Sequence, residues 1–495
     1  MPNQTAQHWT LRTLGRLERA GNRLPHPVVM FVWLMGLIAL GSWLAQWGDW
    51  HVALTASDEP IRARNLLSGE GLRWALINAV DNFTGFAPVG AVLVTMLGLG
   101  VAEQSGLLRV LLVRLVAAVH GRLLSAAVVL AGILSNLAFD VGYVLLIPLA
   151  GALYQAAGRH PLAGIAAAFA GVSAGYSANV VLGPADVILS GISTEAIALV
   201  APGRSVSIGA NYYFLALSTP LLALIGGWLT DRVVEPYLGL WQGSDSGDAT
   251  MPESGSARAL RWVGGWTLLY GAVAVCLVVP EGAPLGSASP AGSPLQALVP
   301  AIALYAAVAG LIYGKLCGRF ARCSDATVGM EQSMASLAGY LVLMFFAAQA
   351  VAWFGWTQLG ALVAAQGADF LQGFKDQPVV LLLLFLVISA LINLFVGSAS
   401  AKWGLLGPIF VPMLFLLGVA PEQTQMAFRI GDSVTNIITP LMPYFGVVLA
   451  FAAKYRSDIG VGGLLAMMLP YSLVFMLGWS VFFGLWLALG WPLGF

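Results

Sequence analysis

Charged residues are scarce in this sequence: they make up 9% of its 495 residues, whereas hydrophobic residues make up 59%. A soluble protein of this length needs far more charge to cover its surface. The composition therefore excludes a soluble enzyme and indicates a polytopic membrane protein. The formal net charge is zero, so nothing suggests a nucleic-acid partner.

Cysteines and nucleotide-binding motifs are equally sparse. The three cysteines are an odd number, and none has partner histidines at metal-ligand spacing, so we expect no metal centre of that kind. No G-x-x-x-x-G-K-[ST] motif occurs, so the chain has no ATP site of its own. We expect no cofactor, and any coupling must come from an ion gradient.

What the chain does have is a series of apolar stretches of about 20 residues, the length that crosses a bilayer. Four arginines precede the first stretch, so the positive-inside rule places the N-terminus in the cytoplasm. A Ser/Gly/Asp-rich stretch at 242–259 predicts a cytoplasmic linker between an N-terminal half, 1–241, and a C-terminal half, 260–495. Lys454 and Arg456 are expected inside, so the last span carries the C-terminus out.

One pattern occurs in both halves and interrupts what would otherwise be membrane helices. The first copy covers about 123–191 and the second about 379–450. Gly/Pro-interrupted apolar segments in matching positions of two halves indicate the binding site of a secondary transporter. The charges that flank the first copy place its start in the cytoplasm and its end near an outer loop around Arg204. The charges that flank the second copy indicate the opposite direction, so we expect an inverted repeat. The matched residues are Asn136 with Asn393, Asn179 with Asn436, and Pro184 with Pro440.

Short polar side chains at these breaks offer oxygen ligands and caps for exposed helix ends. A hard monovalent cation suits such ligands. The candidate Na⁺ ligands are Asn136, Asn179, Asn393, Asp432 and Asn436. The alternative is that these side chains are interhelical hydrogen bonds of the kind that membrane bundles use generally. If the coupling ion is H⁺ instead, Asp432 would titrate rather than coordinate.

Ionisable residues in the broken segments are a sharper signal, because a charge at the centre of a span costs about 2.5–3.5 kcal/mol even on a lenient scale. They are Asp140, Asp186, Arg429 and Asp432. Arg429 and Asp432 are three residues apart and share a helix face, so they could neutralise each other. The alternative, which we favour, is a functional role, because ionisable groups inside a membrane are functional by default. Beside the Gly397–Ser400 break, Lys402 and Trp403 offer a cation and an aromatic face, although Trp403 could equally be an interfacial anchor.

Two enzyme-like signatures leave a membrane-embedded hydrolase of a peptide or amide as the alternative function. Gly171–Gly175 matches G-x-S-x-G, but it follows an alanine-rich run rather than a strand, which favours small-residue packing. Arg429–Asp432 resembles an intramembrane aspartyl-protease motif with arginine in place of its first glycine. A channel is a third option.

Several motifs resemble the aminobenzoyl-glutamate transporter (AbgT) family over nearly the whole chain. They are Asn22-Arg23-Leu24-Pro25-His26-Pro27, the segment 67–74, Gly397-Ser398-Ala399-Ser400-Ala401-Lys402-Trp403, and the segment 429–440. The family's functional positions match Asp186, Asn393, Ser400, Trp403, Pro421, Arg429, Asp432 and Pro440.

The resemblance implies an all-α homodimer with about nine transmembrane helices and two re-entrant hairpins per chain, in a bacterial inner membrane. In such a membrane, the outward C-terminus expected from the charge pattern lies in the periplasm. The resemblance also implies transport of p-aminobenzoyl-glutamate and export of sulfonamide antimetabolites. Both are aromatic amines with a polar or anionic tail. Trp403 is therefore expected to stack on the ring and Arg429 to bind the tail. The direction of transport and the choice of Na⁺ or H⁺ stay open.

Overall fold

The computed structural model describes most of the chain. The described residues are 27–52, 60–117, 121–138, 142–241, 256–278, 283–284, 297–322, 324–439, 442 and 444–495. The N-terminal residues, most of the predicted linker, Asp140 and Pro440 lie outside these ranges. The predicted cytoplasmic N-terminus, the linker and the role of Pro440 therefore stay predictions, as do the boundaries between the two halves.

Among the described residues of the N-terminal half, the regular elements are helices and one short antiparallel β pair. Its elements are α2 (Pro27–Trp47), β1 (His51–Val52), β2 (Ile61–Arg62), α3 (Gly69–Ile77), α4 (Ala79–Thr84), α5 (Ala87–Gln104), α6 (Leu107–Ala117), η1 (Gly121–Leu123), α7 (Leu124–Ser135), η2 (Asn136–Ala138), η3 (Gly142–Leu146), α8 (Ile147–Ala156), α9 (Pro161–Phe169), η4 (Ala170–Ala174), α10 (Pro184–Ala198), α11 (Tyr212–Leu229), η5 (Thr230–Val234) and α12 (Glu235–Leu238). The antiparallel β1–β2 pair is a small departure from the predicted all-α fold.

The regular elements among the described residues of the C-terminal half are all helices. Its elements are α13 (Ser256–Val278), α14 (Leu298–Leu316), α15 (Ser324–Ser336), α16 (Ala338–Trp356), α17 (Leu359–Phe370), η7 (Gln372–Phe374), α18 (Pro378–Asn393), α19 (Ala399–Leu416), α20 (Pro421–Thr435), η8 (Asn436–Ile438), α21 (Phe445–Ala453) and α22 (Val461–Ala488).

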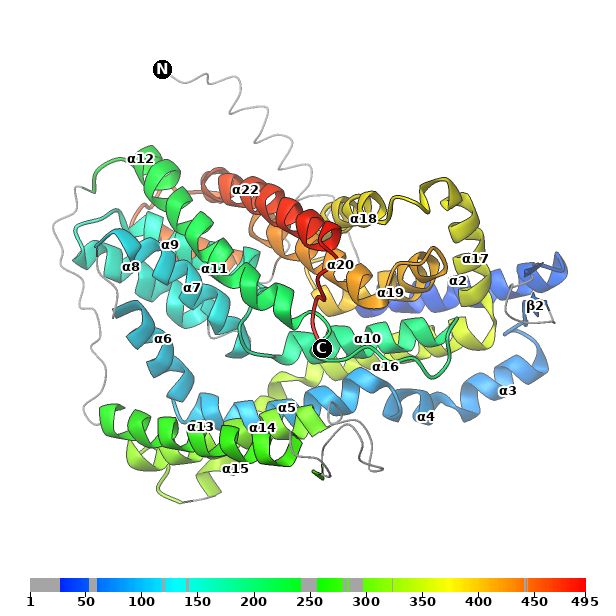
Figure 1. Cartoon of the computed structure of the whole chain (residues 1–495), viewed down its shortest axis with the longest axis horizontal. Helices are drawn as coiled ribbons and strands as arrows, with labels where there is room; N and C mark the ends of the chain where they lie inside the picture. Colours follow the sequence, from blue (N-terminus) through cyan, green and yellow to red (C-terminus); the bar gives the residue numbers. More distant parts are fainter. Residues whose placement is uncertain are drawn as a thin grey trace.

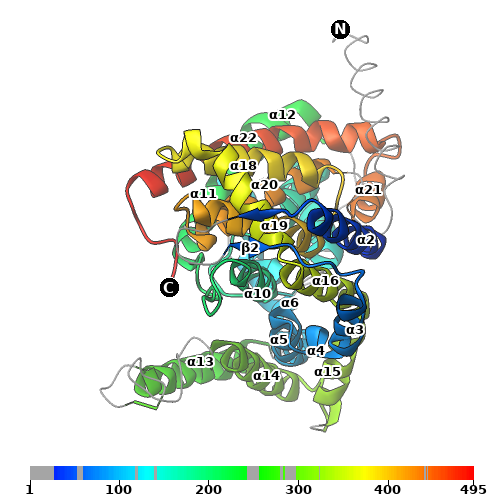
Figure 2. The same cartoon turned by 90° about the vertical axis from the view of Figure 1, so that its right-hand side faces the viewer.

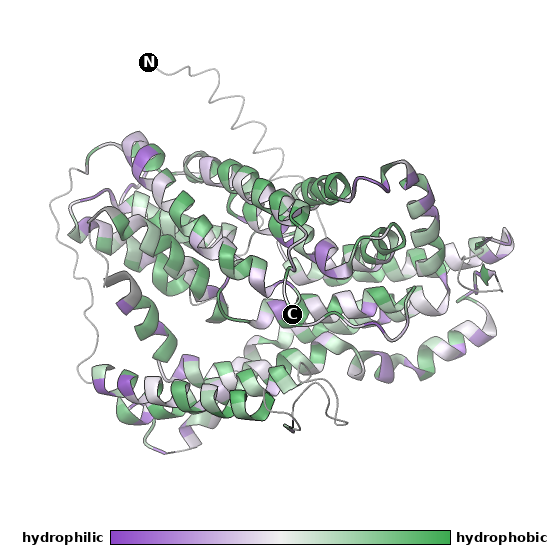
Figure 3. Ribbon diagram, in the orientation of Figure 1, coloured by the Kyte–Doolittle hydropathy of each residue, from purple (hydrophilic) through white to green (hydrophobic). Residues whose placement is uncertain are grey.

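Eight helices within the described ranges are long and apolar enough to cross a membrane. They are α2, α5, α11 with its continuation, α13, α14, α16, α19 and α22. Four shorter apolar helices lie in or at the edges of the two predicted broken segments. Figure 3 shows the hydrophobic colour along most helices and the hydrophilic colour mainly at their ends and loops. The predicted helical, polytopic membrane fold is confirmed.

The helices are arranged in layers. Figures 1 and 2 both place α13, α14 and α15 together at one edge of the molecule, and α18, α20 and α22 lie at the opposite side. Helix α5 packs against α14 and α15 and against α10, so it joins the outer layer to the centre. The segments η4, α10 and α20, which flank the breaks between η4 and α10 and between α20 and α21, are mostly buried within the molecule, as interrupted membrane helices require.

Small residues let α5 approach α14 closely. A Cβ on Gly98 would lie 1.9 Å from the carbonyl oxygen of Ala303, and a Cβ on Gly310 would lie 2.7 Å from the Cα of Ala102. Real Cβ atoms do not approach other atoms so closely, so the helix crossing requires glycine at both positions. Close backbone contact through small residues is a common source of helix association in membranes.

Both predicted broken segments are interrupted in the structure. The first has breaks between α7 and η3 and between η4 and α10, and the second has breaks between α18 and α19 and between α20 and α21. The Tyr154 hydroxyl donates to Ser125 Oγ at 2.6 Å, so the two ends of the α7–α8 unit meet and the unit folds back as a hairpin. The inverted relation of the two copies stays a prediction.

The chain terminus at Phe495 packs beside the loop that follows α10. The Phe495 amide donates to the Gly209 carbonyl at 3.0 Å, and the Phe214 amide donates to the Leu493 carbonyl at 3.1 Å. The C-terminus and the loop around Arg204 thus lie on one side of the molecule. The predicted topology places both of them outside the cytoplasm, and the two placements are mutually consistent.

A polar cluster gathers where α8, α9 and α12 meet. Arg159 Nε donates to Glu235 Oε1 at 3.0 Å, and its Nη2 lies 2.5 Å from Asp231 Oδ1. His160 caps α9, because its Nδ1 accepts from the Leu162 amide at 3.2 Å. Burial lowers the pKa of His160, and the nearby Arg456 charge lowers it further, against an opposing effect of Glu235. The neutral imidazole is therefore the capping form.

Candidate functional site

A buried ion pair joins the two broken segments. Arg429 of α20 places Nη1 2.7 Å from Asp186 Oδ1 at the start of α10. The same guanidinium donates through Nη2 to the Ser177 carbonyl at 3.2 Å, in the break before α10. Asp186 Oδ2 accepts from the Gly183 amide at 2.8 Å and so caps its own helix. Arg429 and Asp186 are 2% and 5% exposed, so this charged contact is shielded from solvent.

A second buried ion pair lies within the C-terminal segment. Lys402 Nζ of α19 contacts Asp432 Oδ1 of α20, and both side chains are 1% exposed. Lys402 Nζ also donates to Asn393 Oδ1. The Asn393 amide nitrogen lies 2.6 Å from the Asp432 carbonyl and 2.9 Å from Asn436 Oδ1. Asn393 thus links the end of α18 to the charged pair and to the end of α20.

The charges of Arg429 and Asp432 each have a partner on another helix. Sequence spacing allowed Arg429 and Asp432 to neutralise each other, but the structure does not form that pair. They do lie on the same helix, but Arg429 extends to Asp186 and Asp432 extends to Lys402. Packing of α20 against both α10 and α19 decides this outcome, because each neighbouring helix supplies a buried opposite charge closer than the i+3 residue.

The four matched asparagines form two local pairs. In the first segment, Asn136 Nδ2 and Asn179 Nδ2 both donate to the Ile133 carbonyl, at 3.2 and 3.4 Å. In the second segment, Asn393 donates to Asn436. The structure therefore brings Asn136 close to Asn179 in the first copy and Asn393 close to Asn436 in the second copy. Their assignment as Na⁺ ligands stays a prediction.

Trp403 is fully buried between helices. Its ring stacks on Phe428 of α20, with ring centroids 4.5 Å apart and an interplanar angle of 28°. Its Nε1 donates to Ser193 Oγ at 3.0 Å and lies 3.2 Å from the Leu189 carbonyl, both on α10. In this arrangement the indole packs α19 against α10 and α20.

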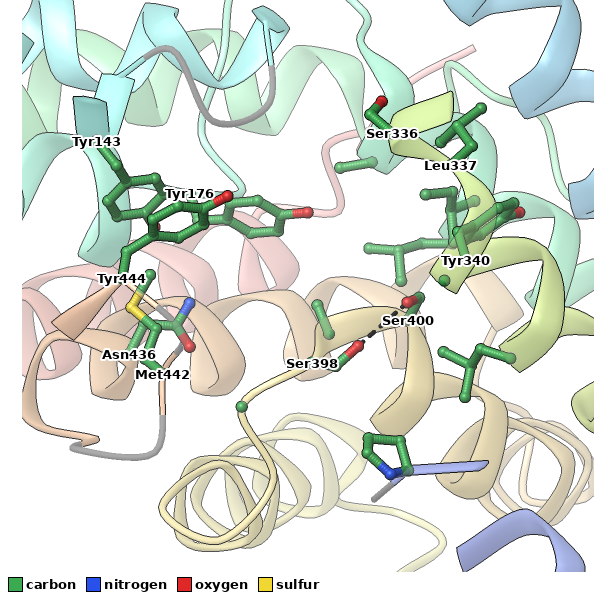
Figure 4. Close-up of a pocket in the computed structure, with 18 residues that line it drawn as sticks. Tyr143, Tyr176, Ser336, Leu337, Tyr340, Ser398, Ser400, Asn436, Met442 and Tyr444 are labelled. Carbon is green, nitrogen blue, oxygen red and sulfur yellow. Dashed lines mark hydrogen bonds between the residues drawn. The ribbon is translucent and has the colours of Figure 1, made fainter. Parts of the chain in front are cut away.

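A cavity of about 510 Å³ lies between the two broken segments and the α15–α16 junction, within the range of roughly 300–1,000 Å³ typical of small-molecule sites. Figure 4 shows tyrosine side chains on one wall and Ser398 and Ser400 at the start of α19. The lining residues are Pro27, Tyr143, Tyr176, Ala185, Ile188, Leu189, Ser336, Leu337, Gly339, Tyr340, Leu343, Gly397, Ser398, Ala399, Ser400, Asn436, Met442 and Tyr444. None of these lining residues is charged.

Of the predicted site residues within the described ranges, Ser400 and Asn436 line this cavity. Asp186 neighbours the lining residue Ala185, and Pro421 starts α20 at a buried position. Sequence reasoning did not single out the tyrosines Tyr143 and Tyr444 as site residues. The available signal was an aromatic residue placed a few positions beyond each break.

The serine-hydrolase signature has a packing role. Ser173 Oγ donates to Met442 Sδ at 3.2 Å in a buried position, and His160 lies at the opposite end of α9. A Cβ on Gly171 would lie 2.2 Å from the Val129 carbonyl oxygen, so glycine is needed where η4 crosses α7. The small-residue interpretation of this motif is confirmed.

Eight candidate spans, two broken segments with buried ion pairs, and a cavity between them define the class of protein: a polytopic membrane transport protein. The family model for the AbgT putative transporter family matches residues 12–495, and the chain belongs to that family. The family and the relatives below are transporters, not enzymes.

Three relatives cover nearly the whole chain. The p-aminobenzoyl-glutamate transport protein of Escherichia coli K12 is 36% identical over 485 residues, which are 97% of this chain and 95% of that protein. The YdaH transporter of Alcanivorax borkumensis, whose crystal structure reveals an unusual topology, is 50% identical, with a TM-score of 0.90 over 95% of this chain and 100% of that one. MtrF of Neisseria gonorrhoeae, which belongs to a class of antimetabolite efflux pumps, is 43% identical, with a TM-score of 0.91 over 96% of this chain and 97% of that one.

Proposed function

We propose that this protein is an ion-coupled secondary transporter of p-aminobenzoyl-glutamate and related aryl amines, including export of sulfonamide antimetabolites. The observation that carries the proposal is the cavity between the broken segments, which combines tyrosine rings with the Ser398 and Ser400 hydroxyls. The names of the E. coli and N. gonorrhoeae relatives support the two substrate classes.

The polar wall of the cavity suits the tail of such a substrate. Ser398 is the N-cap of α19, and Ser400 lies in its first turn, where the helix dipole adds a partial positive charge. Arg429 is engaged by Asp186 in this arrangement, so it would bind a substrate carboxylate only after that pair separates. We therefore assign first contact with the tail to the α19 end of the cavity and a later role to Arg429.

Coupling to a Na⁺ or H⁺ gradient is the second part of the proposal. The Asn393 and Asp432 oxygens, named above as candidate Na⁺ ligands, are in contact with the Lys402 ammonium group. A Na⁺ ion at these oxygens would have to displace that ammonium group, so this arrangement of the site does not fit a bound Na⁺. Flux measurements with a Na⁺ or a proton gradient, imposed one at a time, identify the coupling ion.

The remaining part of the proposal concerns assembly and place. We propose a homodimer in a bacterial inner membrane, with the N-terminus in the cytoplasm and the C-terminus in the periplasm. Cross-linking in native membranes and labelling of cysteines introduced near each terminus test these statements directly. A monomer in the membrane, or both termini on one side, would overturn them.

The test of function is a flux assay in proteoliposomes. The purified full chain should exchange radiolabelled p-aminobenzoyl-glutamate in saturable counter-flow, and an imposed Na⁺ or proton gradient, applied one at a time, should drive accumulation. Mass spectrometry of the recovered substrate should show it unchanged. Release of p-aminobenzoate and glutamate would indicate a hydrolase, and exchange that does not saturate would indicate a channel.

A further inference from the structure

Two tyrosine rings form a stacked pair in the wall of the cavity, and each comes from a different half of the chain. Tyr143 lies in η3, just after the break that follows α7, and Tyr444 lies directly before α21. Their ring centroids are 4.5 Å apart and their planes differ by 7°. Figure 4 shows Tyr176 beside them on the same wall. All three line the cavity; Tyr143 is 5% exposed, so the half-buried rings of Tyr444 and Tyr176 supply most of the accessible aromatic surface, and Tyr143 supports Tyr444 from behind by stacking.

An aromatic surface is the main recognition element that this cavity offers to a ring. The lining residues include no charged side chain, and the remainder of the lining is largely aliphatic or hydroxylic. The Trp403 indole, the expected ring partner, already stacks on Phe428 and is 0% exposed. Offset stacking and edge contacts between rings are favourable beyond the burial of area, so a substrate ring gains most at the tyrosines.

We infer that Tyr143 and Tyr444 form the aryl-binding platform of this transporter and are specificity-determining residues for aromatic substrates. The inference rests on the proposed function and adds the location of the ring within the site. The ring of an aryl amine stacks on the tyrosine pair, and its tail extends toward Ser398 and Ser400 across the cavity.

The platform also has a conformational consequence. Because its two rings come from separate broken segments, it exists only while these segments hold their present relation. A ligand that binds one arrangement better than another shifts the population toward the arrangement it prefers. Binding of an aryl ring therefore favours the arrangement described here.

The experiment compares two ligands that differ in the ring. p-Aminobenzoyl-glutamate carries the aryl amine, whereas N-acetylglutamate keeps an acylated glutamate and lacks the ring. Calorimetric Kd values for both ligands are measured with the full chain in nanodiscs, for the wild type and for Tyr143→Leu and Tyr444→Leu. Tyr143→Phe and Tyr444→Phe keep the rings. Phe482→Leu is the matched control, because Phe482 stacks on Phe214 away from the cavity, with centroids 5.1 Å apart.

The expected result is selective loss. Each leucine variant should weaken p-aminobenzoyl-glutamate by about two- to tenfold, the value of one aromatic contact. The same variants should bind N-acetylglutamate like the wild type, which also shows that they are folded. The phenylalanine variants and Phe482→Leu should bind both ligands like the wild type.

Two results would overturn the inference: unchanged affinity of the leucine variants for the aryl ligand, or equal loss for both ligands. Either result would leave the proposed function intact if the wild-type chain exchanges p-aminobenzoyl-glutamate in counter-flow. Absence of both binding and exchange by the wild type would instead remove the proposed function.

Discussion

Replacing Arg429 with methionine should destabilise the protein, because it leaves the Asp186 carboxylate buried without its cation. Asp186 is 5% exposed, and its Oδ1 has Arg429 Nη1 as its partner at 2.7 Å. The second oxygen, Oδ2, caps α10 through the Gly183 amide and cannot neutralise the charge. Methionine fills a similar volume and offers no hydrogen bond, so the change removes mainly the charge and the donors.

The magnitude follows from the known asymmetry of buried pairs. Removing one partner of a buried ion pair costs about 3–5 kcal/mol, whereas removing both partners is often neutral or even stabilising. We therefore expect Arg429→Met and Asp186→Asn each to cost about 3–5 kcal/mol and the double variant to recover most of that loss. Asparagine keeps an oxygen that can accept from Gly183, so the cap of α10 should survive.

The assay is thermal unfolding of the purified protein in detergent, with transport measured in parallel. Both single variants should unfold at a clearly lower temperature than the wild type, and the double variant should unfold close to it. The matched control is Arg62→Met, which breaks the pair with Asp49, also 2.7 Å long but 60% and 68% exposed. That exposed pair should contribute only about 0–1 kcal/mol.

A double variant as unstable as the sum of the two single variants would show that the two charges are not coupled. Wild-type-like unfolding of Arg429→Met would likewise refute the expected cost, since a buried and unpaired Asp186 carboxylate must be costly. All three variants should lose counter-flow of p-aminobenzoyl-glutamate. Normal transport by the stable double variant would limit the pair to a structural role.

Four further outcomes are expected. Asp432→Asn should abolish gradient-driven accumulation, because the amide keeps the shape and loses the charge; normal accumulation would remove Asp432 from the mechanism. Trp403→Ala should destabilise by about 3–5 kcal/mol and weaken all substrates alike, because the indole is packed in the core; loss confined to aromatic substrates would place the indole at the substrate ring. The His160 contribution to stability should be complete above its ordinary pKa of 6.5 and be lost as pH falls through its lowered folded-state pKa. The unfolding temperature of His160→Asn, which keeps a capping oxygen, should therefore fall less between about pH 7.5 and about pH 5 than that of the wild type; an equal fall in both would remove His160 as the cause. Finally, in a background lacking the native cysteines, cysteines at Asn136 and Asn393 should both be protected from thiol reagents by substrate or coupling ion and change accessibility when the carrier is locked facing one side; labelling that ignores both would refute a shared site.

The family and the positions of the helix breaks were predictable from the sequence. Apolar stretches with little charge require a membrane, and Gly, Pro and Asn residues interrupt a helix through local chemistry that depends only on near neighbours. The breaks near Asn136 and Asn393 could therefore be placed without a structure. The packing role of Gly171–Gly175 was also predictable, because the motif lies in an alanine-rich run without a strand or a base.

The partners of the buried residues needed the tertiary structure. Spacing along α20 allowed an Arg429–Asp432 pair, but α10 and α19 supply Asp186 and Lys402 at closer range. The aromatic substrates implied by the family resemblance suggested that Trp403 would stack on the substrate ring, but packing buries it against Phe428.

The sequence by itself determined the membrane class and the two interrupted segments, because these follow from composition and local chain chemistry, and its motifs carried the resemblance to the family. Only the tertiary structure decided which charges pair and which rings line the cavity. Tyr143 and Tyr444 are about 300 residues apart in the chain, yet their rings stack. A contact of that kind depends on the relative placement of whole helices, which no short stretch of sequence specifies.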